Sequence, residues 1–157
     1  MITSEMMIGA VTFFVAIASF FITPRDVKWF AQLSRPQWLV FEPIIPLIWT
    51  VIFICGAASA NMVWQKNPGG VITWLLMGLY LLVEIITVAY IPLMLRFRSL
   101  KAGEMIGLTG LITAIVLAIC ILPISKLAAL LLIPYLVWSP VGAYTTEELR
   151  QLNPEDA

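Results

Sequence analysis

The chain has 157 residues, of which 61% are hydrophobic and only 11% are charged, and its formal net charge is zero. A soluble domain carries roughly a quarter charged residues, so this composition argues against a water-soluble protein. Zero net charge gives no reason to expect a nucleic-acid partner. The length accommodates one domain of four or five membrane-spanning helices joined by short loops.

The residue types of common catalytic and metal sites are scarce. Histidine is absent, which removes the commonest metal and haem ligand and the usual general base. Cys55 and Cys120 lie inside apolar runs, where a thiol most often behaves as a small hydrophobic group, and no CxxC spacing occurs. We therefore expect no metal site, no required cofactor and no enzymatic activity of the hydrolytic kind.

Five apolar segments have the length of a membrane span. Each has roughly 17 to 25 residues, enough for about 30 Å of hydrocarbon at ~1.5 Å per residue. They lie at about 6–22, 43–64, 71–95, 105–124 and 127–146, with a lid loop at 23–42. The first lacks a basic leader and a cleavage site, so we expect a retained helix. The fourth and fifth divide before Lys126, which would be costly at the bilayer centre. The sequence predicts an all-α integral membrane protein, a single five-transmembrane-helix bundle.

The basic residues predict the orientation of this bundle. With five spans, one side of the membrane holds only Lys66 and Lys126. The other side holds seven basic residues, which are Arg25, Lys28, Arg35, Arg96, Arg98, Lys101 and Arg150. Because short cytoplasmic loops are enriched in lysine and arginine, we expect the N-terminus outside and the C-terminus in the cytoplasm.

Small residues recur along one face of the fourth predicted span. Their spacing of three and four positions forms a smooth stripe that another backbone can approach closely. The stripe consists of Gly103, Gly107, Gly110, Ala114 and Ala118. It predicts either packing against a neighbouring helix of the same chain or the seam of a homodimer.

Glu84 is an acidic residue near the middle of the third predicted span. A charged carboxylate at that depth costs at least a few kcal/mol, so we expect Glu84 to be protonated or paired and to face the bundle interior. Tyr80 and Thr87 lie on the same helical face and are the expected partners. A structural hydrogen bond, ligand contact, proton handling and an axial bond to the metal of a pigment are the alternatives.

Tryptophans are the most informative residues. Trp64 and Trp74 flank the QKNPGG turn, as interfacial anchors do. Trp49 and Trp138 lie deeper, about two and three turns into their spans. Prolines on both sides of Trp138 predict bends that open grooves between helices. We therefore expect Trp49 and Trp138 to line a cavity for a flat apolar ligand, covered by the first loop.

Aromatic residues and prolines form an ordered set of motifs along the chain. The stretch WFAQLSRPQW carries Trp29 and Trp38, and Trp49 and Trp64 follow. An aromatic-x-Pro motif begins at Tyr90. The stretch PYLVW then carries Pro134, Tyr135 and Trp138. This set resembles the TspO/MBR family of translocator and tryptophan-rich sensory proteins, and the spacings match without insertion from about Trp29 to Thr146.

The resemblance implies a five-helix bundle, usually a homodimer, in which a long first loop closes a pocket for tetrapyrroles and, in some members, sterols or other lipids. The ligand would be a porphyrin, haem or chlorophyll-like tetrapyrrole, and the function its transport, sensing or regulation. The pocket tryptophans would be Trp49 and Trp138, with Trp29 and Trp38 in the lid. Other implied ligand-binding positions are Glu84, Thr87, Tyr90, Pro134 and Tyr135. Light-dependent porphyrin breakdown, described for some members, is the lowest-ranked interpretation here.

The chain also departs from the family pattern. Val40 and Phe41 stand where two prolines are common. Three polar positions differ, namely Thr87 for asparagine, Ile106 for aspartate and Thr146 for asparagine, and Glu84 is an additional acid. These departures leave a second hypothesis open: a structural or assembly subunit that keeps the fold within a larger membrane complex, in contact with pigment.

Overall fold

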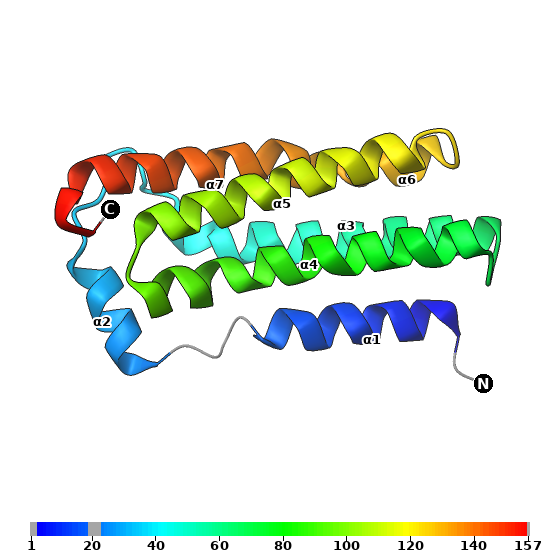
Figure 1. Ribbon diagram of the computed structural model, residues 1–157, viewed down its shortest axis with the longest axis horizontal. Helices are drawn as coiled ribbons and strands as arrows, with labels where there is room; N and C mark the ends of the chain where they lie inside the picture. The colour runs from blue at the N-terminus through cyan, green and yellow to red at the C-terminus, as the bar shows by residue number, and fades with distance from the viewer. Residues whose placement is uncertain (1–2, 19–22, 157) are drawn as a thin grey trace.

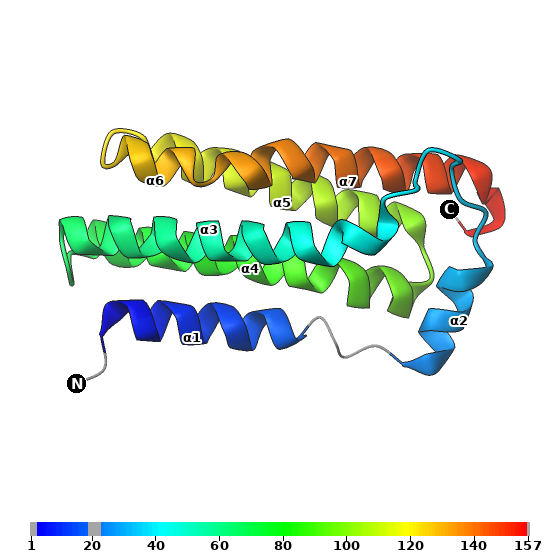
Figure 2. The same cartoon turned by 180° about the vertical axis from the view of Figure 1, so that it is seen from behind.

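The computed structural model describes residues 3–18 and 23–156, and its regular structure in these ranges is entirely helical. An elongated bundle forms from helices that run along one axis (Figures 1 and 2). These are α1 (Ser4–Ile17), α3 (Ile45–Lys66), α4 (Val71–Phe97), α5 (Leu100–Ile121) and α7 (Ile133–Leu152). The shorter elements are α2 (Pro24–Gln32), η2 (Glu42–Ile44), α6 (Lys126–Leu130) and η3 (Pro154–Asp156). Helix α2 lies across one end of the bundle.

Four stretches have the length and composition of membrane spans. They are Glu42–Lys66, Val71–Phe97, Leu100–Ile121 and Lys126–Leu152. Helix α1 is apolar but has only 14 residues, about 21 Å at ~1.5 Å per residue. Residues 19–22 of the first predicted span lie outside the described residues. The structure thus confirms an all-helical fold with four apolar helices long enough to cross a bilayer.

The chain turns sharply between α5 and α6, where the sequence predicts a division. Ser125 caps α6, because its hydroxyl accepts a hydrogen bond from the Ala128 N–H at 3.2 Å. Leu131 and Leu132 then interrupt the helix, and Pro134 occupies the first turn of α7. Because of this interruption, the Ala128 carbonyl is available to a neighbouring helix. It accepts a hydrogen bond from the Ser59 hydroxyl on α3 at 2.7 Å. A break in one helix thereby ties two helices together.

The sequence predicts a lid loop at 23–42, but in the structure the first part of this range is the helix α2. Thr23 and Asp26 form a reciprocal capping box at the start of this helix, and Pro24 occupies its first turn. Trp29 and Leu33 are buried at 9% and 6% exposure. They pack with residues of the adjacent helix ends, Met94, Leu95, Leu100 and Leu149, in a second hydrophobic cluster. Helix α2 is therefore a packed element of the fold.

The small-residue stripe faces the interior of the same chain. A methyl group added at Gly103 would lie 2.6 Å from the Met94 sulfur, and one added at Gly110 would lie 2.8 Å from the Tyr135 hydroxyl. At Gly107 the nearest atom is in the Tyr90 ring, 3.6 Å away. The stripe is thus covered by α4 and α7. Ala114 is buried at 2% exposure, and Ala118 packs against the larger hydrophobic cluster in the middle of the bundle. The structure therefore supports the first alternative, packing within the chain.

Candidate functional site

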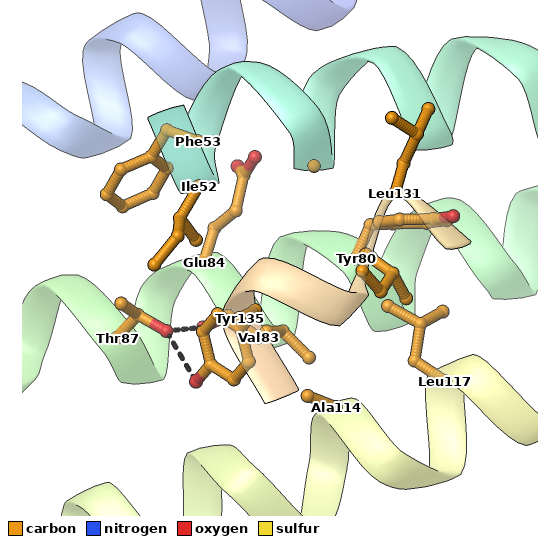
Figure 3. A pocket seen from close by; sticks show the side chains of 12 residues that line it. Ile52, Phe53, Tyr80, Val83, Glu84, Thr87, Ala114, Leu117, Leu131 and Tyr135 are labelled. Carbon is orange, nitrogen blue, oxygen red and sulfur yellow. Dashed lines mark hydrogen bonds between the residues drawn. The ribbon is translucent and has the colours of Figure 1, made fainter. Parts of the chain in front are cut away.

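A small cavity lies inside the bundle and joins residues from α3, α4, α5 and the α6–α7 junction (Figure 3). Its volume is about 40 Å³. Most of its walls are apolar. The lining residues are Ile52, Phe53, Gly56, Tyr80, Val83, Glu84, Thr87, Ala114, Leu117, Leu131, Leu132 and Tyr135. Three residues predicted to bind ligand, Glu84, Thr87 and Tyr135, therefore meet at one cavity, and Ala114 of the predicted packing stripe also lines it.

Two hydroxyl pairs hold the cavity wall together. The Thr87 hydroxyl contacts the Tyr135 hydroxyl at 2.9 Å and the Val83 carbonyl at 2.7 Å, which joins α4 to α7. The Ser59 hydroxyl contacts the Tyr80 hydroxyl at 2.5 Å, which joins α3 to α4. Both tyrosine rings are buried, at 6% and 8% exposure. These pairs hold the two tyrosine side chains at the cavity and satisfy their hydroxyl groups.

Glu84 finds its partner on a different helix from the one expected. The Thr12 hydroxyl of α1 donates a hydrogen bond to Glu84 Oε1 at 2.6 Å. Thr12 is the one buried residue among the described residues of α1. Tyr80 and Thr87, the predicted partners, bond to Ser59 and Tyr135 instead, so that prediction is wrong. Tyr80 and Thr87 do lie on the same face of α4 as Glu84, but their hydroxyl groups form hydrogen bonds with residues of α3 and α7.

The tryptophans predicted to line the cavity lie one turn outside it. Trp49 contacts the Tyr135 ring edge-on, with ring centroids 6.0 Å apart, and packs on Phe53 at 6.4 Å. Phe53 and Tyr135 are the residues that reach the cavity. Trp138 contacts Phe41 at 6.0 Å. The structure therefore differs from the predicted wall: aromatic rings surround the cavity, but its inner layer is Phe53, Tyr80 and Tyr135.

A second aromatic layer lies where the first loop crosses α7. Trp38 stacks on Tyr144 with ring centroids 5.8 Å apart and an interplanar angle of 28°. Phe41 bridges Trp38, at 5.8 Å, to Trp138. An open groove of about 450 Å³ runs beside this layer and is lined by Trp38, Pro140, Val141 and Tyr144. Phe41 therefore forms the link between the loop and α7.

Carboxylates on the C-terminal part of the chain hold this layer and α2. The Trp38 indole N–H donates to Glu148 at 2.5 Å, and the Tyr144 hydroxyl also donates to Glu148. The Trp29 indole N–H donates to Asp156 at 2.8 Å. Both tryptophans of the predicted lid are thus anchored to the end of α7 and to η3, and neither points into the inner cavity.

The backbone of the first loop is fastened to the same region. The Asn153 side chain accepts a hydrogen bond from the Ser34 N–H at 2.8 Å and donates one to the Ser34 carbonyl at 2.9 Å. Arg35 forms an ion pair with Glu42 at 2.9 Å within the loop. Tyr90 lies nearby and hydrogen-bonds Thr146 on α7. Tyr90 therefore belongs to this end of the bundle, and Pro134 shapes the start of α7 beside Tyr135.

Several residues of the site carry no obvious sequence signal. Thr12 and Ser59 are isolated hydroxyls within apolar runs, and only the packing of three helices gives them partners. Glu148 lies in an acidic stretch, and the sequence alone would predict that this stretch is a helix end facing water. Within residues 3–18 and 23–156, no group of three or more His, Cys, Asp or Glu residues has the arrangement of a metal site.

Comparison with known proteins adds independent evidence. A model of the TspO/MBR family matches residues 7–152. The chain is 25% identical to the uncharacterized membrane protein YtaB of Bacillus subtilis, with 97% of each chain covered. It is 30% identical to the tryptophan-rich protein TspO of Chlorobaculum tepidum over 89% of each chain. It is 32% identical to translocator protein 2 of the dog, covering 76% of this chain and 70% of that protein.

Proposed function

Because the chain belongs to the TspO/MBR family and is a multi-pass integral membrane protein, we propose that it binds a tetrapyrrole within the membrane. The ligand class comprises porphyrins, haem and chlorophyll-like pigments, and the role is their transport, sensing or regulation by binding rather than turnover. The observation that carries the proposal is the pair of aromatic layers, one around the inner cavity and one between the first loop and α7. Flat aromatic walls suit a flat apolar ligand.

Binding requires the inner cavity to enlarge. Its volume of about 40 Å³ is far below the ~300–1,000 Å³ typical of sites for larger ligands. In this proposal the ligand enters at the first loop. Polar contacts, rather than a helix, hold this loop at the end of the bundle, so that breaking a few hydrogen bonds would release it. Release of these contacts would connect the 450 Å³ groove to the rings of Trp138, Trp49 and Tyr135. The structure is then the closed form of the binding protein.

The proposal includes a membrane topology. In this topology α1 belongs to a fifth span, the predicted segment 6–22 with which it overlaps, the N-terminus lies outside and the C-terminus is cytoplasmic. This arrangement is supported by the bundle itself, since α2, the α4–α5 turn and the end of α7 share one end (Figure 1). That end carries seven of the nine basic residues, and the opposite end carries Lys66 and Lys126. A homodimer in this topology pairs through lipid-facing surfaces outside the α5 stripe.

Titration of the purified protein with protoporphyrin tests the proposal. We expect binding in the parent and an affinity reduced roughly tenfold or more in the double variant Trp49→Phe with Trp138→Phe, because each ring contact contributes about 0.5–1.5 kcal/mol. Trp64→Phe with Trp74→Phe is the matched control, since these rings pack together at the far end of the bundle. Porphyrin absorbance is the readout, because the variants change tryptophan fluorescence. Equal affinity in both double variants would refute the site.

The small size of the closed cavity favours one alternative, an assembly subunit that keeps the fold without a free-ligand pocket. Such a subunit would pack into a larger membrane complex and touch pigment held by its partners. Purification under mild detergent separates the two functions. A homodimer or monomer that binds protoporphyrin supports the tetrapyrrole-binding protein, whereas a stoichiometric large complex without porphyrin affinity supports the subunit.

A further inference from the structure

The hydroxyls around the inner cavity have no hydrogen-bond donor left to offer. Each hydroxyl carries one proton. Thr87 uses its proton on the Val83 carbonyl, so Tyr135 must be the donor in the Thr87–Tyr135 contact. Ser59 uses its proton on the Ala128 carbonyl, so Tyr80 must be the donor in the Ser59–Tyr80 contact. The proton of each tyrosine is therefore committed to these contacts.

Glu84 adds a carboxyl group to the same wall. Its Oε1 receives the Thr12 hydrogen bond, while none of the described residues donates to Oε2. No buried side-chain oxygen among the described residues lacks a partner, so Oε2 has accessible surface. Glu84 is also the one acidic residue among those that line the cavity, and none of them is basic. The remaining lining side chains are apolar or aromatic, and the N–H groups of helix interiors are used within the helices.

From this single carboxyl group in an otherwise apolar and aromatic lining we infer that the cavity selects a ligand whose buried part is a cationic or N–H-bearing nitrogen on a flat aromatic body, with Glu84 as the residue that determines this preference. A donor nitrogen finds Glu84 Oε2 as its acceptor, and the Phe53, Tyr80 and Tyr135 rings as surfaces for a positive charge. A ligand that presents a carboxylate there meets the acidic Glu84 and no basic side chain.

This inference rests on the proposed function, because the same cavity has to open for the ligand. It also gives a bound tetrapyrrole an orientation. The pyrrole nitrogens belong near Glu84, and any acidic side chains of the ligand belong at the end of the bundle where α2 lies (Figure 1), which carries most of the basic residues. An acidic group in the interior and a basic entrance thus discriminate between the two ends of one ligand.

Aminoacridine and acridine form a matched pair of probes for this preference. They share one flat ring system, but aminoacridine is a cation with N–H donors at neutral pH, whereas acridine is neutral and offers only an acceptor. We expect the detergent-purified parent to bind aminoacridine about tenfold or more tightly than acridine, and Glu84→Gln to reduce this ratio to about one. Glu155→Gln, which removes an exposed carboxylate, should retain the parent ratio. A ratio near one in the parent, or an unchanged ratio in Glu84→Gln, would overturn the inference.

A second measurement needs no substitution. An apolar carbodiimide should modify Glu84 in the parent, as read by mass spectrometry, and aminoacridine should protect it while acridine should not. Equal modification with both probes would also overturn the inference. Protoporphyrin titration in parallel separates the two proposals: protoporphyrin binding without an aminoacridine preference refutes only the role of Glu84. A preference that depends on Glu84 without protoporphyrin binding refutes only the tetrapyrrole assignment.

Discussion

At the scale of single residues, Gly110 shows how closely α5 approaches the site. A methyl group at this position would lie 2.8 Å from the Tyr135 hydroxyl and 3.3 Å from an Ile86 methyl. Tyr135 is the residue that joins the cavity, the Thr87 hydrogen bond and the Trp49 ring contact. The absence of a side chain at one position of α5 therefore supports the geometry of the cavity wall.

We expect Gly110→Ala to destabilise the protein by about 1–3 kcal/mol, because overpacking forces Tyr135 to move and strains its bond to Thr87. Denaturation in detergent, followed by thermal midpoint, measures the change. Gly78→Ala is the matched control: nothing lies within 4 Å of the added methyl, and alanine is the better helix former. If both variants unfold at the parent temperature, the close contact at Gly110 has no energetic role.

The same scale shows what sequence spacing can and cannot predict. Periodicity places Glu84, Tyr80 and Thr87 on one face of α4, and the structure agrees. It cannot predict that Thr12, 72 positions earlier, supplies the hydrogen bond, because that contact depends on how α1 packs against α4. Trp49 illustrates the same limit. The sequence predicts that Trp49 lines the cavity, but Phe53, one helical turn further along α3, occupies that position.

At the scale of elements, α2 is a helix because its first residues satisfy their own backbone groups. The Thr23 hydroxyl accepts from the Asp26 N–H at 3.3 Å, and Asp26 accepts from the Thr23 N–H at 3.3 Å and its hydroxyl at 2.7 Å. The Thr23 hydrogen bonds, aided by Arg96 and Arg98, lower the pKa of Asp26 below its ordinary value of 3.8, against a smaller opposing effect of desolvation. The negative charge is favourable at a helix N-terminus.

This pKa predicts an acid-sensitive start of α2. Because the pKa in the folded state is depressed, the contribution of Asp26 to stability is complete above its ordinary value of 3.8 and is lost as the pH falls through the lower folded value. Hydrogen exchange of the first α2 amides, corrected for the intrinsic rate, should therefore quicken below about pH 4. Asp26→Asn should show no such step. An identical acid step in this variant would assign the effect to another group.

The apolar helices were predictable and α2 was less so, for a physical reason. Span length and charge exclusion predict the regions of α3, α4, α5 and the α6–α7 pair directly. The capping box of α2 is visible in the sequence TPRD, yet its few turns are stable only because Trp29 and Leu33 pack on distant helix ends. A short helix gains most of its stability from such packing, which local sequence does not show.

At the scale of the whole molecule, the two ends of the bundle differ in charge. Loops at the α2 end carry most of the basic residues, whereas the end near the α3–α4 turn has few. The proposed topology places the α2 end in the cytoplasm.

Cysteine labelling checks this topology. In a background with Cys55→Ala and Cys120→Ala, we expect Asn67→Cys to react with a membrane-impermeant maleimide added to intact cells. Lys28→Cys should react only after lysis, because positively charged loops are retained on the cytoplasmic side. The reverse pattern would invert the proposed orientation, and reaction at both positions in intact cells would exclude it.

The anchoring of the first loop also has a consequence for the order of assembly. Ser34 is held by Asn153, 119 positions later, and Trp29 by Asp156, 127 positions later. During synthesis the N-terminal helices emerge first, so these two hydrogen bonds cannot form until residues 153–156 have been made. Before that point the first loop lacks both polar contacts, and this end of the bundle closes only after α7 and η3 have been added.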